Sequence, residues 1–93
     1  MSDSPLPNLP GAPPCAAPGY ARWEHGQRQR YYEFRRLQDL WGAWSTVTSW
    51  GQIGTSLGRQ VSSALADAEA VDLAFGGIAR RRAADGYRLV ASV

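Results

Sequence analysis

The 93-residue sequence lacks the features that would place it among secreted or membrane proteins. Its single cysteine, Cys15, cannot form a disulfide within the chain, which excludes a disulfide-stapled scaffold. No apolar run approaches the roughly 20 residues that span a bilayer. The amino terminus also lacks the basic and apolar segments of a signal peptide. We therefore expect a cytoplasmic protein that does not act at a membrane.

Groups that could perform catalysis or bind a metal are also scarce. The one histidine, His25, lies in a polar stretch with no cysteine or carboxylate at metal-ligand spacing, and a solvated surface position explains it. Cys15 lies in the proline-rich leader, away from any plausible base, so a Cys/His nucleophile pair is not expected. The glycines of residues 51–58 match neither a phosphate loop nor a dinucleotide fingerprint. We expect no enzyme, no cofactor, no metal and no small-molecule substrate.

Lysine is absent, and all ten basic residues are arginine, in a chain of net charge +2. Arginine presents a planar set of donors that suits phosphate and carboxylate, and it stacks on aromatic rings. A coding sequence rich in G and C would produce the same bias, and the abundance of alanine, glycine and proline fits that explanation. The composition by itself therefore does not predict nucleic-acid binding.

All six prolines lie within the first 18 residues. Proline removes backbone donors and blocks helices, so we predict a disordered leader over residues 1–20 and a single domain over residues 21–93. A core of about 65 to 70 residues is marginal in stability, so it needs large side chains. The sequence supplies Trp23, Tyr31, Tyr32, Phe34, Trp41, Trp44, Trp50, Phe75 and Tyr87.

Alternating side chains predict strands at residues 28–37 and 44–50. In the first, Tyr32 and Phe34 share one face, and in the second Trp44, Thr46, Thr48 and Trp50 do. A stretch rich in glycine follows, and residues 59–65 are expected to return as a third strand.

Residues 67–85 have the pattern of an amphipathic helix, with Asp67 as its amino-terminal cap and Gly86 as its end. Its predicted apolar stripe comprises Ala68, Val71, Ala74, Phe75, Ile78 and Arg82. Residues 87–90 resume an extended pattern. The sequence thus predicts an α+β domain of order β-β-β-α-β, in which one helix packs on a small antiparallel sheet.

Three blocks then appear in order: Tyr31-Tyr32-Glu33-Phe34, Trp50-Gly51-Gln52-Ile53-Gly54-Thr55 and Gly86-Tyr87. Together they resemble the WGR domain, which is named for a Trp-Gly-Arg motif and occurs in poly(ADP-ribose) polymerases and in short or fused bacterial proteins. Further similar positions are the stretch 40–44, the helix residues 69–75 and Arg82, and the resemblance covers about residues 28–92.

The resemblance implies a curved antiparallel sheet with one helix and binding of DNA at duplex ends or breaks, with Trp50 as the contact platform. A half-buried anchor of the turn is the structural alternative for Trp50. The sequence departs from the motif at Gln52, which cannot neutralise a phosphate, and Arg59 is the nearest replacement. The predicted nucleic-acid contacts are Trp50, Gly51, Gln52, Arg59, Arg35, Arg80 and Arg81.

Two functions therefore stay open. The first is a DNA-binding module. The second is a protein-interaction module in which DNA binding is weak or lost, favoured by Gln52 and by the small net charge. The arginines at 80–82 also fit a solvated helix end that complements the helix dipole.

Overall fold

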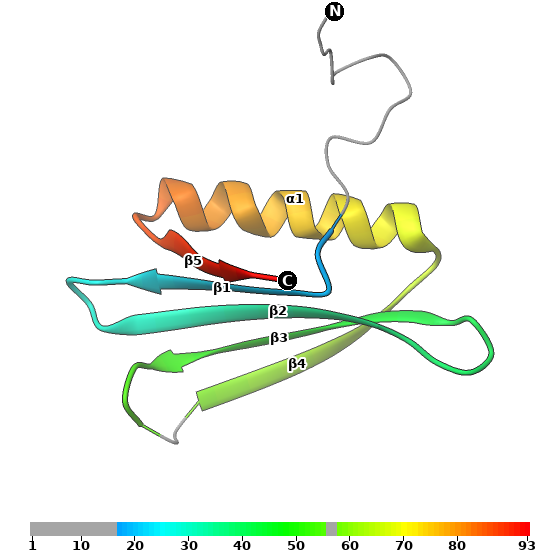
Figure 1. Cartoon of the computed structure of the whole chain (residues 1–93), viewed down its shortest axis with the longest axis horizontal. Coiled ribbons are helices and arrows are strands. Elements are labelled where there is room, and N and C mark those ends of the chain that lie inside the picture. The colour runs from blue at the N-terminus through cyan, green and yellow to red at the C-terminus, as the bar shows by residue number, and fades with distance from the viewer. Residues whose placement is uncertain (1–16, 56–57) are drawn as a thin grey trace, which may run out of the picture.

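The computed structural model describes residues 17–55 and 58–93. Most of the leader predicted over residues 1–20, namely residues 1–16 with Cys15, lies outside the described residues. The elements are β1 (Tyr20–His25), β2 (Arg30–Gln38), β3 (Trp44–Gln52), β4 (Gly58–Leu65), α1 (Ala68–Ala84) and β5 (Arg88–Ser92). The strands form one antiparallel sheet of order β4-β3-β2-β1-β5, and α1 runs along one side of it (Figure 1). The predicted α+β class is confirmed.

The first strand along the chain, β1, was not expected from the sequence, which predicted four strands rather than five. Only Ala21 and Trp23 of its six residues are buried, so its alternating apolar signal is short. The strand is held by backbone pairing to β2 on one side and to β5 on the other. It is therefore the strand that connects the last strand of the chain to the rest of the sheet.

Residues 17–20, which precede the predicted boundary at residue 21, also make contacts with the domain. Ala17 is buried, and its backbone N–H donates to the Asp72 carboxylate at 2.8 Å. The backbone N–H of Gly19 donates to the carbonyl of Val93 at 2.8 Å. Residues 17–20 thus join the two ends of the described domain.

The limits of α1 agree with the sequence prediction. The Asp67 side chain accepts a hydrogen bond from the backbone N–H of Ala70 at 2.8 Å, as an amino-terminal cap does. At the other end Gly86 has a φ of +89°, a left-handed conformation that glycine adopts without strain. This reversal returns the chain along β1 as β5.

The core lies between α1 and the middle of the sheet. Phe75 of α1 packs on Trp23 and Phe34, with ring centroids 5.8 and 5.2 Å apart. Phe34 and Val71 are fully buried. Side chains alternate along a strand, so the residues that share a face with Phe34 define the helix side of the sheet, and the other face is called the outer face.

Candidate nucleic-acid interface

A row of paired residues crosses the helix side of the sheet. The strand register places Trp23 opposite Tyr32, Tyr32 opposite Trp50, and Trp50 opposite Arg59. The rings of Tyr32 and Trp50 stack with centroids 5.9 Å apart and an interplanar angle of 13°. Trp50 is only half-buried. The row therefore runs from the core, at Trp23, to a partly exposed aromatic surface that ends at an arginine.

Two open cavities adjoin the Trp50 ring. The first, of about 380 Å³, lies by the β3–β4 turn and is lined by Arg30, Trp50, Gly51, Gln52, Thr55, Gly58 and Arg59. The second, of about 330 Å³, lies toward the end of α1 and is lined by Arg30, Tyr32, Trp50, Arg82 and Tyr87. Trp50 and Arg30 line both cavities, so we refer to the two cavities together as the Trp50 surface.

Tight backbone packing fixes the start of β4 beside Trp50. A side chain at Gly58 would place its Cβ 2.7 Å from the Tyr31 hydroxyl and 3.0 Å from the Trp50 carbonyl oxygen, so any larger residue would force Tyr31 and the Trp50 backbone to shift. In the turn, Gly54 has a φ of +84°, and the Ile53 N–H donates to the Gln29 carbonyl at 2.7 Å. These contacts hold Arg59 opposite Trp50.

Arg82 closes the second cavity from the helix. Its guanidinium carbon lies 4.4 Å from the centroid of the Tyr32 ring and 5.2 Å from that of Tyr87. The side chain is only 17% exposed, and its Nη2 lies 3.4 Å from the Asp85 carboxylate. Its Nε is buried and makes no hydrogen bond with any described residue. A cation between two aromatic rings stabilises their positions by about 0.5–2 kcal/mol per contact.

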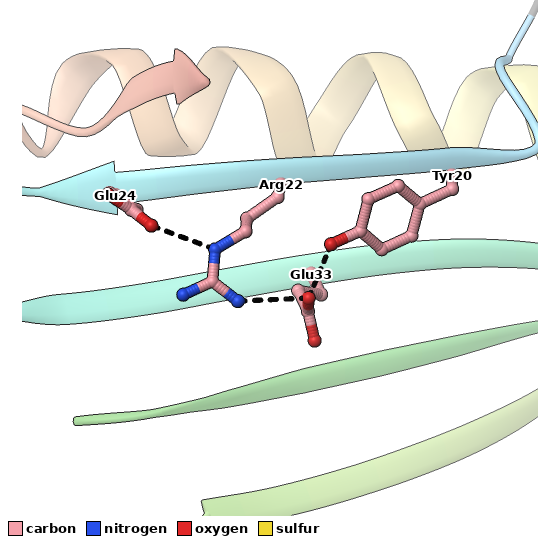
Figure 2. Close-up of polar contacts among 4 residues, drawn as sticks. All are labelled: Tyr20, Arg22, Glu24 and Glu33. Atoms are coloured by element: carbon pink, nitrogen blue, oxygen red, sulfur yellow. Dashed lines mark hydrogen bonds and ion pairs between the residues drawn. The ribbon is translucent and has the colours of Figure 1, made fainter. Parts of the chain in front are cut away.

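The carboxylates of the strands lie on the outer face, away from the Trp50 surface. Glu33 accepts hydrogen bonds from the Tyr20 hydroxyl at 2.5 Å and from Arg22 at 3.0 Å, and Arg22 also donates to Glu24 at 2.9 Å (Figure 2). Arg30 and Arg59, on the helix side, have no ion pair with any described residue. The helix side near Trp50 therefore carries two positive charges, Arg30 and Arg59, that no described carboxylate neutralises.

This outer cluster also changes two pKa values. Burial raises the pKa of the Tyr20 hydroxyl above its ordinary value, and the hydrogen bond to Glu33 and the charge of that carboxylate raise it further. Burial lowers the pKa of Arg22, but the hydrogen bonds to Glu24 and Glu33 outweigh that effect, and its pKa is raised overall. In this outer cluster each carboxylate therefore has a hydrogen-bond partner within the sheet.

The structure brings four of the seven predicted contact residues together and leaves three apart. Trp50, Gly51, Gln52 and Arg59 all line the first cavity. Arg35 lies on the outer face, with its guanidinium carbon 4.9 Å from the centroid of the Tyr20 ring.

The other two residues, Arg80 and Arg81, are exposed on α1 and line neither of the cavities beside Trp50. Arg81 contacts Asp85 at 3.8 Å instead.

Besides Thr55 and Gly58 at the β3–β4 turn, sequence reasoning missed four residues of the Trp50 surface: Arg30, Tyr32, Arg82 and Tyr87. Two of them reach it through strand register, since Arg30 pairs with Gln52 and Tyr32 with Trp50. A register derived from the hairpin between the two predicted strands could have found them. The other two come from α1 and from the segment that follows it, and only the packing of the helix on the sheet reveals their position.

Among the described residues, no group of three or more histidine, cysteine or carboxylate side chains could hold a metal ion. In the same part of the chain, no helix is long and apolar enough to cross a membrane.

The fold and the site thus define a small α+β module with an aromatic and basic surface at one end of its sheet. The model of the WGR domain family matches residues 22–92, and the chain belongs to that family. WGR domains are non-catalytic modules known for binding nucleic acid. Neither the comparison with curated proteins nor that with solved structures found a match.

Proposed function

We propose that this protein binds DNA at duplex ends or breaks through the Trp50 surface, and that it is not an enzyme. The observation that carries the proposal is the stacked Tyr32–Trp50 pair, flanked by Arg30 and Arg59, neither of which is neutralised by a described carboxylate. Stacking of a base on an aromatic side chain contributes about 1–3 kcal/mol. The two arginines would each neutralise a backbone phosphate.

The position of Arg30 supports this reading despite the departure at Gln52. These two residues are register partners on neighbouring strands, and both line the first cavity. The positive charge that the motif carries at its third position is here supplied from across the hairpin. Gln52 itself is exposed and can donate a hydrogen bond to a phosphate or a sugar.

Arg35, Arg80 and Arg81 would contact only DNA that extends beyond the Trp50 surface. We place them outside the primary contact set because they line neither cavity. Their substitution is expected to change the salt dependence of binding less than substitution of Arg30 or Arg59.

The test is Trp50→Ala, with Trp41→Ala as its matched control. Trp41 is 87% exposed in the turn between β2 and β3, whereas Trp50 lies at the opposite end of β3. We expect Trp50→Ala to weaken binding to a blunt duplex about 5- to 150-fold, from the loss of one stacking contact. Trp41→Ala should bind as the wild type does. If circular dichroism shows an intact fold and Trp50→Ala still binds normally, the proposal is wrong.

A protein-interaction role is the second candidate, and one observation favours it. Leu40 and Trp41 are 94% and 87% exposed at the tip of the β2–β3 hairpin. Two hydrogen bonds hold the turn, because the Asp39 carboxylate accepts from the backbone N–H groups of Trp41 and Ala43, each at 2.9 Å. Large apolar side chains held in solvent are typical of contact surfaces.

A pull-down after nuclease treatment separates the two functions. Recovery of one specific protein by the wild type, and its loss with Trp41→Ala, would support the second candidate. Recovery of nucleic acid alone would count against it. Both candidates are compatible with a cytoplasmic protein, which is the location we propose.

A further inference from the structure

The strand β4 forms an open edge of the sheet. Among the described strands it pairs only with β3, over eight consecutive register pairs with no bulge (Figure 1). Every residue of β4 except Leu65 is exposed. Natural edge strands are usually protected by proline, lysine, a bulge or an inward charge. β4 has none of the first three, and its only charge, Arg59, lies near one end.

The other edge of the sheet is protected. β5 has five residues, against eight in β4, and its pairing with β1 contains an irregularity between Arg22 and Trp23. β4 is therefore the edge that offers a long, regular row of backbone donors and acceptors that no described residue pairs with.

We propose that a second copy of this chain pairs with β4, antiparallel, around a two-fold axis at Val61. A two-fold axis between antiparallel edge strands is perpendicular to the sheet, so side chains that meet across it come from the same face. The two Val61 side chains, each 47% exposed, would then pack against each other on the helix side.

Charge and size along β4 favour a second copy as the partner. With Val61 on the axis, Arg59 lies opposite the partner's Ser63, and Gln60 lies opposite the partner's Ser62. No like charges meet, because Arg59 is the only charged residue in the strand and it does not face its own copy. The small side chains of one half of the strand would face the long side chains of the other half, so the edge is complementary to itself.

The dimer would be one sheet with both helices on the same side. The two Arg59 residues would be offset by four residues along the strand direction, or about 14 Å at 3.4 Å per residue. Both Trp50 surfaces would then face the same way. That consequence rests on the proposed function, whereas the dimer itself does not and is tested without nucleic acid.

Sedimentation equilibrium of the full chain over a wide concentration range is the first test. We expect the mass of the wild type to rise from 10.1 kDa toward twice that value with concentration. Val61→Lys places two like charges on the axis and should remain monomeric. Val90→Lys, a matched change at an exposed site on β5, should dimerise like the wild type. A wild type that remains monomeric throughout, or a Val61→Lys variant that dimerises normally, would overturn the proposal.

Disulfide trapping tests the register of the dimer, and it remains informative even if Val61→Lys fails to fold. In a Cys15→Ser background, Val61→Cys brings two thiols directly opposite each other, so mild oxidation should give a covalent dimer. Ser62→Cys should not, because each Ser62 faces the partner's Gln60 and the two cysteines would be too far apart for a disulfide. Efficient crosslinking of Ser62→Cys together with none of Val61→Cys would overturn the axis at Val61.

Discussion

Replacing Gln52 with arginine would restore the residue for which the WGR motif is named, and the structure predicts two opposite effects. Gln52 is exposed, lines the first cavity beside Trp50 and is the register partner of Arg30. A new guanidinium there would reach the same ligand as Arg30 and Arg59. It would also place two like charges directly opposite each other on neighbouring strands, which destabilises a sheet.

The size of the effect on DNA affinity can be calculated from counterion release. With two phosphates neutralised, by Arg30 and Arg59, the logarithm of the binding constant should fall with a slope of about −1.8 against the logarithm of salt concentration, and a third contact makes it about −2.7. Over a fourfold increase in salt, the affinity of the wild type should fall about 12-fold, and that of Gln52→Arg about 40-fold. At low salt the variant should bind more tightly.

The same substitution should lower the stability of the fold. A pair of like charges should cost about 0.5 kcal/mol, which in a domain of this size lowers the Tm by about 2–4 °C without DNA. The assays are fluorescence anisotropy at several salt concentrations and thermal unfolding by circular dichroism. Gln60→Arg is the control, because it makes the same change on the outer face. The reasoning is refuted if Gln52→Arg and Gln60→Arg show the same salt slope.

Three further predictions concern the fold. Phe75→Ala removes the helix side chain that packs on the buried aromatic rings of the sheet and should lower the free energy of unfolding by about 3–5 kcal/mol in urea denaturation; a loss below about 1 kcal/mol would contradict the described core. Asp67→Ala removes the cap that accepts from Ala70 and should cost about 1 kcal/mol, whereas Asp67→Asn should retain most of it. Tyr20→Phe removes the hydroxyl bonded to Glu33 and should cost about 1 kcal/mol near neutral pH. Because the folded-state pKa of Tyr20 is raised, its contribution is complete below pH 10 and is lost as the pH rises through that pKa; the difference between wild type and Tyr20→Phe should therefore shrink in alkaline solution, and a constant difference would argue against the cause given.

The strands β2, β3 and β4 and the helix could be predicted because each has a strong local signal. Trp44, Thr46, Thr48 and Trp50 alternate over a whole strand, and the predicted helix is bounded by a cap at Asp67 and a glycine with positive φ. Such signals depend only on neighbours in sequence. β1 could not be predicted in this way, because its two buried residues gain their partners from β2 and α1.

The residues of the candidate site also differ in whether local sequence could predict them. Trp50, Gly51, Gln52 and Arg59 are close in sequence and remain close in space, so a local motif sufficed to group them. Arg82 was predicted in the apolar stripe of the helix, and it does lie on the side that faces the sheet. Its place between Tyr32 and Tyr87 depends on how the helix docks, which no local pattern encodes.

The most direct test of the central claim is fluorescence anisotropy of a labelled blunt-ended duplex titrated with the protein at low and moderate salt, beside a closed circular duplex of the same sequence. Recognition of DNA ends by the Trp50 surface predicts salt-sensitive binding that prefers the duplex with ends. Absence of binding at low salt, or equal binding to both molecules, would contradict recognition of DNA ends by the Trp50 surface.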